Sequence, residues 1–221
     1  MTTPSPAVLS AETIRRALAE YKLEVNEQQV LQIQQYMRLL LDWNDKINLT
    51  AIRDPLEILH RHFCECMYAG VAVPVENGRL ADVGSGAGFP GIPLKIMRPG
   101  LHVFLIESNM KKATFLAEVL RNLELPDCKV LVSRYEELGE EVAPLDFACT
   151  RALGEFDSFL AWAASEHIAV KRVILWLGGR DLDQARRGPG WDWAEPIPVP
   201  NSLRRYLLVG SKKVPSVGAT T

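Results

Sequence analysis

The run from Leu80 to Gly91 places a short apolar segment, one acid and four glycines within twelve residues. Arg79 to Val83 is typical of a buried parallel strand, and the glycines that follow predict a loop with positive φ that lies close against a ligand. Pro90 and Pro93 suit the first turn of a helix. The free N–H groups of a helix N-terminus favour partial negative charge, so this segment predicts a site for a carboxylate or a phosphate.

Two nucleotide sites fit this loop. Gly86-x-Gly88-x-x-Gly91 matches the dinucleotide fingerprint, which is weak evidence when it stands alone. Asp82, two residues before Gly84, fits better the Asp-x-Gly-x-Gly-x-Gly loop of Rossmann-like methyltransferases. In that loop the methionine part of S-adenosylmethionine lies over the glycines, and the acid orients its ammonium group. We therefore expect Asp82, Gly84, Gly86 and Gly88 to bind S-adenosylmethionine.

A second acid stands where the other half of a nucleotide site is expected. Glu107 directly follows the predicted strand 102–106 and lies 25 residues after Asp82. An acid about 20 residues beyond the glycines accepts hydrogen bonds from ribose hydroxyls in such sites. We predict this role for Glu107; a carboxylate that only caps the helix beginning near Asn109 is the alternative.

The remaining pattern is that of an α/β protein. Three helices, with N-caps at Ser10, Asn26 and Asp54, precede the first strand. Strands and helices then alternate, which predicts a parallel sheet with helices on both faces. Strands are expected at 79–83, 102–106, 129–133, 145–149 and 172–177, with helices at 91–98, 109–123 and 155–166. Residues 193–200 and 203–210 predict a terminal antiparallel pair.

These elements predict a Rossmann-like class I methyltransferase fold with a seven-stranded, mostly parallel sheet. We expect residues 1–75 to form a helical extension packed on the core, residues 76–213 to form the S-adenosylmethionine-binding domain, and residues 214–221 to be a tail. A chain of 221 residues with 48% hydrophobic content is long enough for one substantial core.

Charge and cysteine content argue against several classes of protein. The net charge is −2, so any contact with nucleic acid must come from local basic patches. The four cysteines form no CxxC pair and have no histidines at metal spacing, so no metal site or disulfide framework is indicated. The sequence shows no signal peptide and no run of 18 apolar residues, which predicts a cytoplasmic protein without membrane contact.

Two further segments follow predicted strands, at the sheet edge where doubly wound folds bind ligands. Tyr135 and Glu136 are candidates for contacts with adenine, although acids at the start of a helix are an equally good explanation. Arg151 follows the fourth strand, and a cation there points into the cleft where transfer occurs. We assign Arg151 as the catalytic residue; a structural ion pair is the alternative.

Taken together, several segments resemble the bacterial ribosomal RNA small subunit methyltransferase G family, also called glucose-inhibited division protein B. They are Trp43-Asn44-x-x-Ile47-Asn48-Leu49-Thr50, Arg53-Asp54-Pro55, Arg61-His62, Asp82 to Pro93, Arg134 to Glu137 and Thr150-Arg151-Ala152. The resemblance implies methylation at N7 of a guanine in 16S ribosomal RNA, with S-adenosylmethionine as the methyl donor. We expect the RNA to be modified within the small ribosomal subunit, by a monomer of this protein. Carried over to this sequence, the donor contacts are Gly84, Phe89, Tyr135, Glu136 and Arg151, with Glu107 at the ribose.

The chain departs from the family pattern at a few positions. Gly178 stands where the family usually has a lysine on the substrate side, and Glu65 and Cys66 stand where Asp and Ser are usual. These changes leave a methyltransferase of small molecules or proteins as the alternative function, and a non-catalytic or dehydrogenase-type nucleotide binder as the third.

N7 of guanine already has a lone pair, so methyl transfer to it depends on alignment with the donor and needs no general base. Among the histidines, His62 beside Arg61 is the candidate for a phosphate or base contact.

Overall fold

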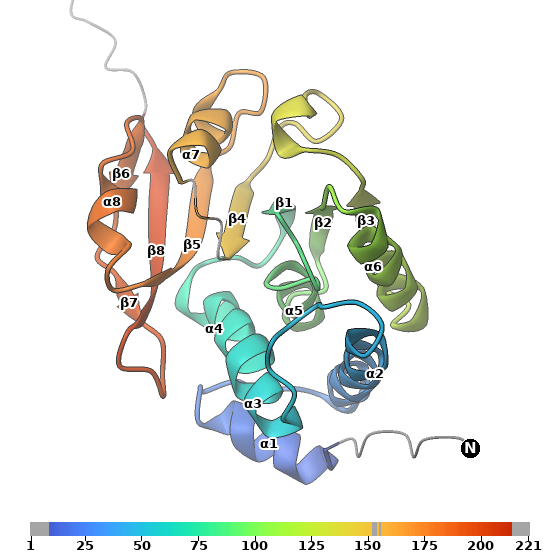
Figure 1. Cartoon of the computed structure of the whole chain (residues 1–221). Helices are drawn as coiled ribbons and strands as arrows, with labels where there is room; N and C mark the ends of the chain where they lie inside the picture. Colours follow the sequence, from blue (N-terminus) through green and yellow to red (C-terminus); the bar gives the residue numbers. More distant parts are fainter. Residues whose placement is uncertain (1–8, 152–153, 155, 214–221) are drawn as a thin grey trace, which may run out of the picture.

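The computed structural model describes residues 9–151, 154 and 156–213 (Figure 1). The predicted tail, residues 214–221, lies outside the described residues. The elements are α1 (Ala11–Ala19), α2 (Glu27–Asn44), α3 (Pro55–Ile58), η1 (Leu59–Cys64), α4 (Glu65–Ala72), β1 (Gly78–Val83), α5 (Gly91–Met97), β2 (Leu101–Ile106), α6 (Met110–Asn122), β3 (Cys128–Leu131), η2 (Tyr135–Glu137), β4 (Phe147–Arg151), α7 (Phe156–Ala164), β5 (Arg172–Gly178), α8 (Leu182–Arg186), β6 (Trp191–Trp193), β7 (Ile197–Pro198) and β8 (Arg205–Lys212).

The N-terminal helices begin at the predicted caps. The Ser10 side chain accepts a hydrogen bond from the Thr13 backbone N–H, and the Asp54 side chain accepts one from Glu57. Asn26 and Gln29 form the predicted capping box, in which each side chain accepts from the other residue's backbone N–H at 2.9 Å. The three starts read from the sequence are therefore confirmed.

The third helical segment differs from a simple amphipathic helix. The segments α3, η1 and α4 run on without a break, and η1 is π-helical, a local change of winding that occurs frequently at functional sites. The helical spacing of Leu56, Phe63 and Met67 predicts that all three point inward. Phe63 and Met67 are fully buried, but Leu56 is 42% exposed. Leu56 lies in the first helical turn, at the outer end of the segment.

The described residues form a sheet in the strand order β3-β2-β1-β4-β5-β8-β6, with β7 paired to β8 in addition (Figure 1). The first five strands of this order are parallel, and β8 is antiparallel to β5. The predicted fold class is therefore confirmed, but the described sheet has eight strands where seven were expected, because two short strands pair with β8 in place of one. The expected final hairpin exists, but β6 and β7 share the place of its first strand, and α8 was not predicted.

The strand β4 begins later than predicted, at Phe147, and ends at Arg151 instead of Cys149. Asp146 explains the late start, because its carboxylate accepts hydrogen bonds from the Arg79 backbone N–H at 2.9 Å and from Lys171 at 2.8 Å. These contacts fix Asp146 at the amino end of the sheet. Arg151 is consequently the last residue of the strand, opposite Trp176 of β5.

Each face of the sheet is covered by its own set of helices. One buried cluster joins the sheet to α1, α2, η1, α4, α5 and α6, and the other joins it to α7 and α8. Side chains along β5 alternate between them: Ile174 and Trp176 belong to the first cluster, and Val173 and Leu175 to the second. The N-terminal helices therefore share one core with the sheet (Figure 1). Among the described residues, no helix has the length and apolar character needed to cross a bilayer.

Candidate active site

The loop of residues 84–91 connects β1 to α5 with the predicted backbone. Gly84, Gly86 and Gly88 have φ of 69°, 58° and 89°, the left-handed region that favours glycine. A Cβ atom on Gly88 would lie 2.5 Å from the Tyr36 hydroxyl and 2.6 Å from Ile92, whereas one on Gly86 would meet only the Gly84 carbonyl, at 3.8 Å. Gly88 thus leaves room for the protein's own side chains, and Gly86 borders open space.

Two side chains from distant elements hold this loop. Tyr36 of α2 is fully buried, and its hydroxyl donates a hydrogen bond to the Ala87 carbonyl. Its ring stacks on Phe89 with centroids 5.2 Å apart. Glu107 accepts hydrogen bonds from the backbone N–H groups of Gly86 at 2.9 Å and Asn109 at 2.7 Å. The Glu107 carboxylate therefore joins the loop to the start of α6, and its contact with the ribose of a donor stays a prediction.

Asp82 supports the loop from behind. Its side chain is fully buried, accepts a hydrogen bond from the Gly91 N–H at 2.9 Å and faces the Cys149 thiol at 3.8 Å. Burial raises the pKa of Asp82 to about 7, against the opposing effect of the Gly91 hydrogen bond. The structure thus places Asp82 where it fixes the start of α5, and its contact with a ligand's ammonium group stays a prediction.

Two cavities meet at Gly84. The first, of about 170 Å³, is bounded by the ends of β2 and β3 and by η2, and Glu107, Tyr135 and Glu136 line it. Tyr135 packs edge-on against Trp162, with centroids 5.4 Å apart, which fixes its ring at the cavity wall. The second, of about 240 Å³, is lined by Leu49, Thr50, His62, Gly84, Ser85, Gly86, Ala87, Phe89 and Arg151. The loop therefore has one cavity on each side, and we call the two together the divided site.

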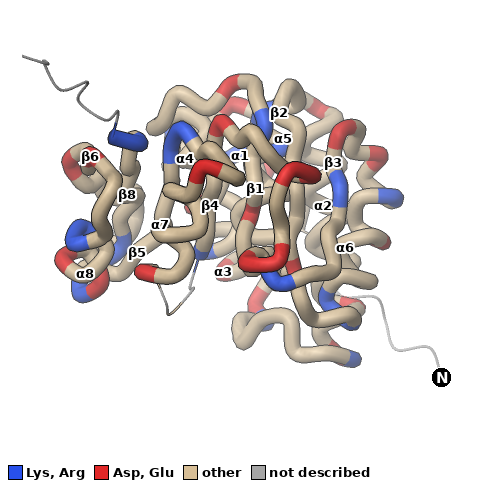
Figure 2. Tube along the Cα trace, turned by 90° about the horizontal axis from the view of Figure 1, so that it is seen from above, with Lys and Arg blue, Asp and Glu red and all other residues tan. Residues whose placement is uncertain are grey.

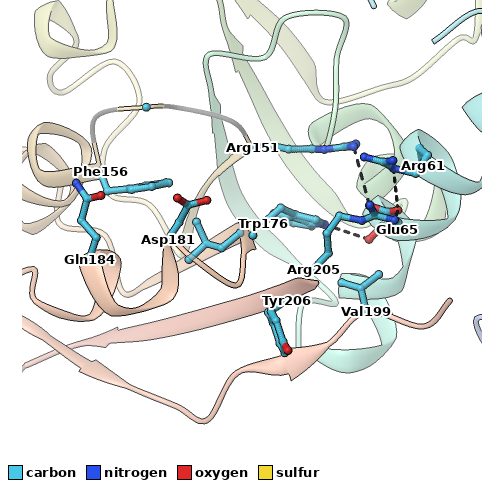
Figure 3. Close-up of a pocket in the computed structure, with 13 residues that line it drawn as sticks. Arg61, Glu65, Arg151, Phe156, Trp176, Asp181, Gln184, Val199, Arg205 and Tyr206 are labelled. Atoms are coloured by element: carbon cyan, nitrogen blue, oxygen red, sulfur yellow. Dashed lines mark hydrogen bonds and ion pairs between the residues drawn. The ribbon is translucent and has the colours of Figure 1, made fainter. Parts of the chain in front are cut away.

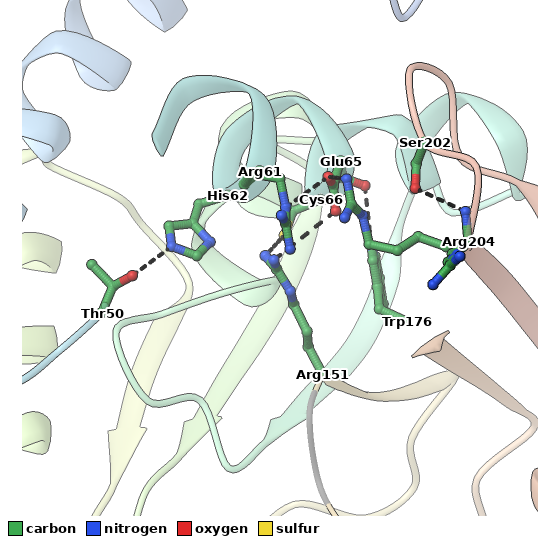
Figure 4. Close-up of polar contacts among 10 residues, drawn as sticks. Thr50, Arg61, His62, Glu65, Cys66, Arg151, Trp176, Ser202 and Arg204 are labelled. Carbon is green, nitrogen blue, oxygen red and sulfur yellow. Dashed lines mark hydrogen bonds and ion pairs between the residues drawn. The ribbon is translucent and has the colours of Figure 1, made fainter. Parts of the chain in front are cut away.

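One wall of the second cavity comes from the N-terminal part of the chain, with Thr50 in the loop after α2 and His62 on η1 (Figure 4). Asn44, at the end of α2, accepts hydrogen bonds from the N–H groups of Leu49 and Thr50 and donates one to the Thr50 carbonyl. The Thr50 hydroxyl lies 2.8 Å from His62 Nε2, and the His62 ring stacks on Phe89 at 4.8 Å. Burial, with the nearby charges of Arg151 and Arg61, lowers the pKa of His62 to about 3, so its ring is neutral.

Arg151 projects from β4 toward a buried acid on α4 (Figure 4). It donates to the Cys66 sulfur at 3.3 Å and lies 4.0 Å from the Glu65 carboxylate. Glu65 is 1% exposed and also pairs with Arg205 at 2.6 Å and Arg61 at 3.4 Å. Arginines stay protonated in proteins, so three cations share one carboxylate and positive charge is in excess. The ion pair foreseen as the alternative for Arg151 is present, beside a cavity that Arg151 also lines.

The structure brings most predicted site residues together. Gly84, Gly86, Phe89, Glu107, Tyr135, Glu136 and Arg151 line the two cavities. Asp82 lies behind the loop, and Gly88, within the loop, faces the buried side chain of Tyr36. Sequence reasoning missed Tyr36, whose spacing marks only a buried helical position, and the Glu65 cluster, whose members come from three distant segments. The sequence pairs Arg186-Arg187 and Arg204-Arg205 are candidates for phosphate contacts. In the structure Arg205 pairs with Glu65 at 2.6 Å and Arg186 with Glu195 at 3.3 Å.

Comparisons with known proteins identify the family of this chain. Residues 29–187 match the family model for rRNA small subunit methyltransferase G. The chain belongs to the ribosomal RNA small subunit methyltransferase G family. It is 38% identical to a protein of that name from Pelotomaculum thermopropionicum, covering 77% of this chain and 80% of the relative. It is 37% identical to one from Dichelobacter nodosus, covering 93% and 97%.

A solved structure shows the same fold at low identity. A SAM-dependent methyltransferase from Aquifex aeolicus superposes with a TM-score of 0.57 at 16% identity, over 72% of this chain and 94% of that one. As a family member, the protein is an S-adenosylmethionine-dependent methyltransferase. The divided site fits that donor, because open space borders Gly86 and a carboxylate faces the first cavity. Glu107, Tyr135 and Glu136 would hold the adenosine half, and Gly86, Phe89 and Arg151 the methionine half.

The raised pKa of Asp82 predicts a pH dependence of stability. Between the ordinary pKa of 3.8 and about 7, the folded state keeps a proton that the unfolded state releases. The free energy of unfolding should therefore fall as pH rises through this window, by up to about 1.4 kcal/mol per pH unit. Asp82→Asn stays neutral and should lose this contribution, as urea unfolding of both proteins from pH 5 to 8 would show. His62 contributes the opposite slope in both, so parallel stability curves for the two proteins would contradict the shift.

Glu107 is expected to carry much of the donor affinity. Glu107→Gln keeps an acceptor for one backbone N–H but removes the charge, and should weaken S-adenosylmethionine binding by roughly 1–3 kcal/mol in calorimetric titration. Glu140→Gln is the matched control, because Glu140 is exposed and lines neither donor cavity. Equal donor affinity of both variants would show that Glu107 serves only the loop and α6.

Proposed function

We propose that this methyltransferase modifies N7 of a guanine in 16S ribosomal RNA, presented within the small ribosomal subunit. The family name supports the RNA class, since the relatives are ribosomal RNA small subunit methyltransferases. The observation that carries the proposal is a third cavity, of about 480 Å³, which Arg151 lines together with the methionine side of the donor site. A base in that cavity is adjacent to the donor without crossing the sheet.

Local charge supports an RNA substrate although the chain is slightly acidic. Figure 2 shows Lys and Arg interspersed with Asp and Glu along the whole trace. At the third cavity, however, Arg61, Arg151 and Arg205 surround the single carboxylate of Glu65. Their unshared positive charge favours a polyanion at this position. Binding would then depend on this cluster and not on the net charge.

The geometry suits a nucleophile that keeps its protons. S-adenosylmethionine supplies an electrophilic methyl group when bound. N7 of guanine attacks with an in-plane lone pair, so the positive charge passes from the donor to the base and no proton leaves. His62 is neutral and Arg151 is charged throughout the neutral range. The chain's task is to align two groups, an effect worth several orders of magnitude in rate.

We also propose that a single copy of the chain is sufficient. The N-terminal helical segment and the sheet together bring the donor cavities and the third cavity side by side. A monomer docked on the subunit would then carry both the donor and the substrate base. Light scattering at the working concentration of the assay would check this, and activity confined to a dimer would contradict it.

The N7 assignment predicts a flat pH profile. Single-turnover methyl transfer to unmethylated small subunits, at saturating donor, should change little between about pH 6.5 and 9, because no base must titrate for attack. Saturating donor matters because Asp82 titrates near the lower end of this range. Nuclease digestion and mass spectrometry of the labelled RNA should identify 7-methylguanine.

The alternative substrates give a different profile. A protein or small-molecule acceptor with an oxygen or amine nucleophile must lose a proton, so its rate should rise about tenfold per pH unit below the relevant pKa. Gly178, in place of the family's usual lysine beside the third cavity, is the feature that favours this alternative. Label in protein or metabolites of a lysate, with none in ribosomal RNA, would refute the RNA proposal.

A further inference from the structure

The third cavity contains an acid that the donor site does not use. Asp181 directly follows the β5–α8 turn, where its backbone N–H donates to the Gly178 carbonyl at 3.0 Å. A Cβ atom on Gly178 would lie 3.2 Å from the Asp181 carboxylate. The acid therefore folds back over the carboxyl end of β5, the edge at which sheets of this kind bind substrates. Figure 3 shows Asp181 between Phe156 and Trp176.

This carboxylate has no structural task among the described residues. An Asp at a helix N-cap ordinarily accepts a hydrogen bond from the first turn, but Asp181 makes no such bond to α8. No ion pair or side-chain hydrogen bond of Asp181 exists within residues 9–151, 154 and 156–213. A partly buried acid without a partner is costly unless a ligand supplies donors.

The cavity has two chemically different ends (Figure 3). Arg151, Arg61 and Arg205 gather around Glu65 at one end, next to the donor site. Asp181 lies at the other, on the side of the Phe156 ring, and Trp176, whose indole N–H donates to the Glu65 carbonyl at 3.0 Å, lies between the two ends. A volume of about 480 Å³ falls within the range of small-molecule sites and accommodates one nucleoside turned out of its stack.

We infer that Asp181 selects guanine by accepting hydrogen bonds from its N1–H and 2-amino groups. This inference rests on the proposed function. Among the RNA bases, guanine places these two donors side by side, so one carboxylate accepts both, whereas adenine has an acceptor at N1 and no 2-amino group. N7 lies across the purine ring from that edge. A guanine held by Asp181 therefore directs N7 and O6 toward the Arg151 end, where the donor lies.

Kinetics on small subunits test this assignment. Asp181→Ala should lower kcat/KM for methyl transfer to unmethylated small subunits by roughly 5- to 150-fold, the range for one bidentate base contact. The affinity for S-adenosylmethionine should stay at the wild-type value, and the thermal midpoint should not fall, because the unpartnered carboxylate costs stability in the free protein. Asp183→Ala is the control. This substitution removes the same charge two residues away, and Asp183 is exposed and does not line the cavity.

Competition by free nucleotides adds a readout that a structural role would not move. Wild type should be inhibited more strongly by GMP than by IMP, which lacks the 2-amino group, and least by AMP. In Asp181→Ala the preference of GMP over IMP should disappear. A wild-type enzyme without a preference for GMP over AMP, or a variant that retains the wild-type kcat/KM or preference, overturns the role of Asp181. Absence of transfer to small subunits by the wild type refutes the proposed function itself.

Discussion

The site depends on how tightly the glycine loop is held from inside the protein. Gly88 packs against Tyr36 so closely that no side chain fits, and the Tyr36 hydroxyl binds the neighbouring Ala87 carbonyl. Asp82 holds the other end through the Gly91 N–H. These contacts fix the loop on its inner side, and Gly86 is consequently the position that faces open space. The cavities exist because the loop cannot relax into them.

This constraint makes the N-terminal helices part of the donor site. Tyr36 belongs to α2, and Asn44 at the end of the same helix shapes the turn that carries Thr50. Thr50 in turn contacts His62, whose ring covers Phe89 of the loop. His62 is presented by the π-helical segment η1, which continues into α4 with Glu65. The extension therefore completes both the donor site and the cationic end of the adjoining cavity.

The sequence predicted what local patterns determine. The strand, glycine loop and helix around Gly86 have a strong local signature, and Glu107 follows from its distance along the chain. Contacts between segments were not predictable in this way. Tyr36 occupies an ordinary buried helical position, and the pairing of Glu65 with Arg205 joins residues 140 positions apart. No periodicity or spacing encodes such contacts, because they arise only when the two faces of the sheet are assembled.

If S-adenosylmethionine occupies the open space at Gly86, calorimetric titration of two glycine variants should distinguish them. Gly86 and Gly190 both have positive φ, and a Cβ atom on either meets nothing closer than 3.6 Å, so Val at each introduces comparable backbone strain. Gly190 lies outside the donor cavities. Gly86→Val, folded by circular dichroism, should lose donor affinity by at least about 100-fold, while Gly190→Val should stay within about twofold of wild type. Equal donor affinity in both variants would mean that S-adenosylmethionine binds elsewhere.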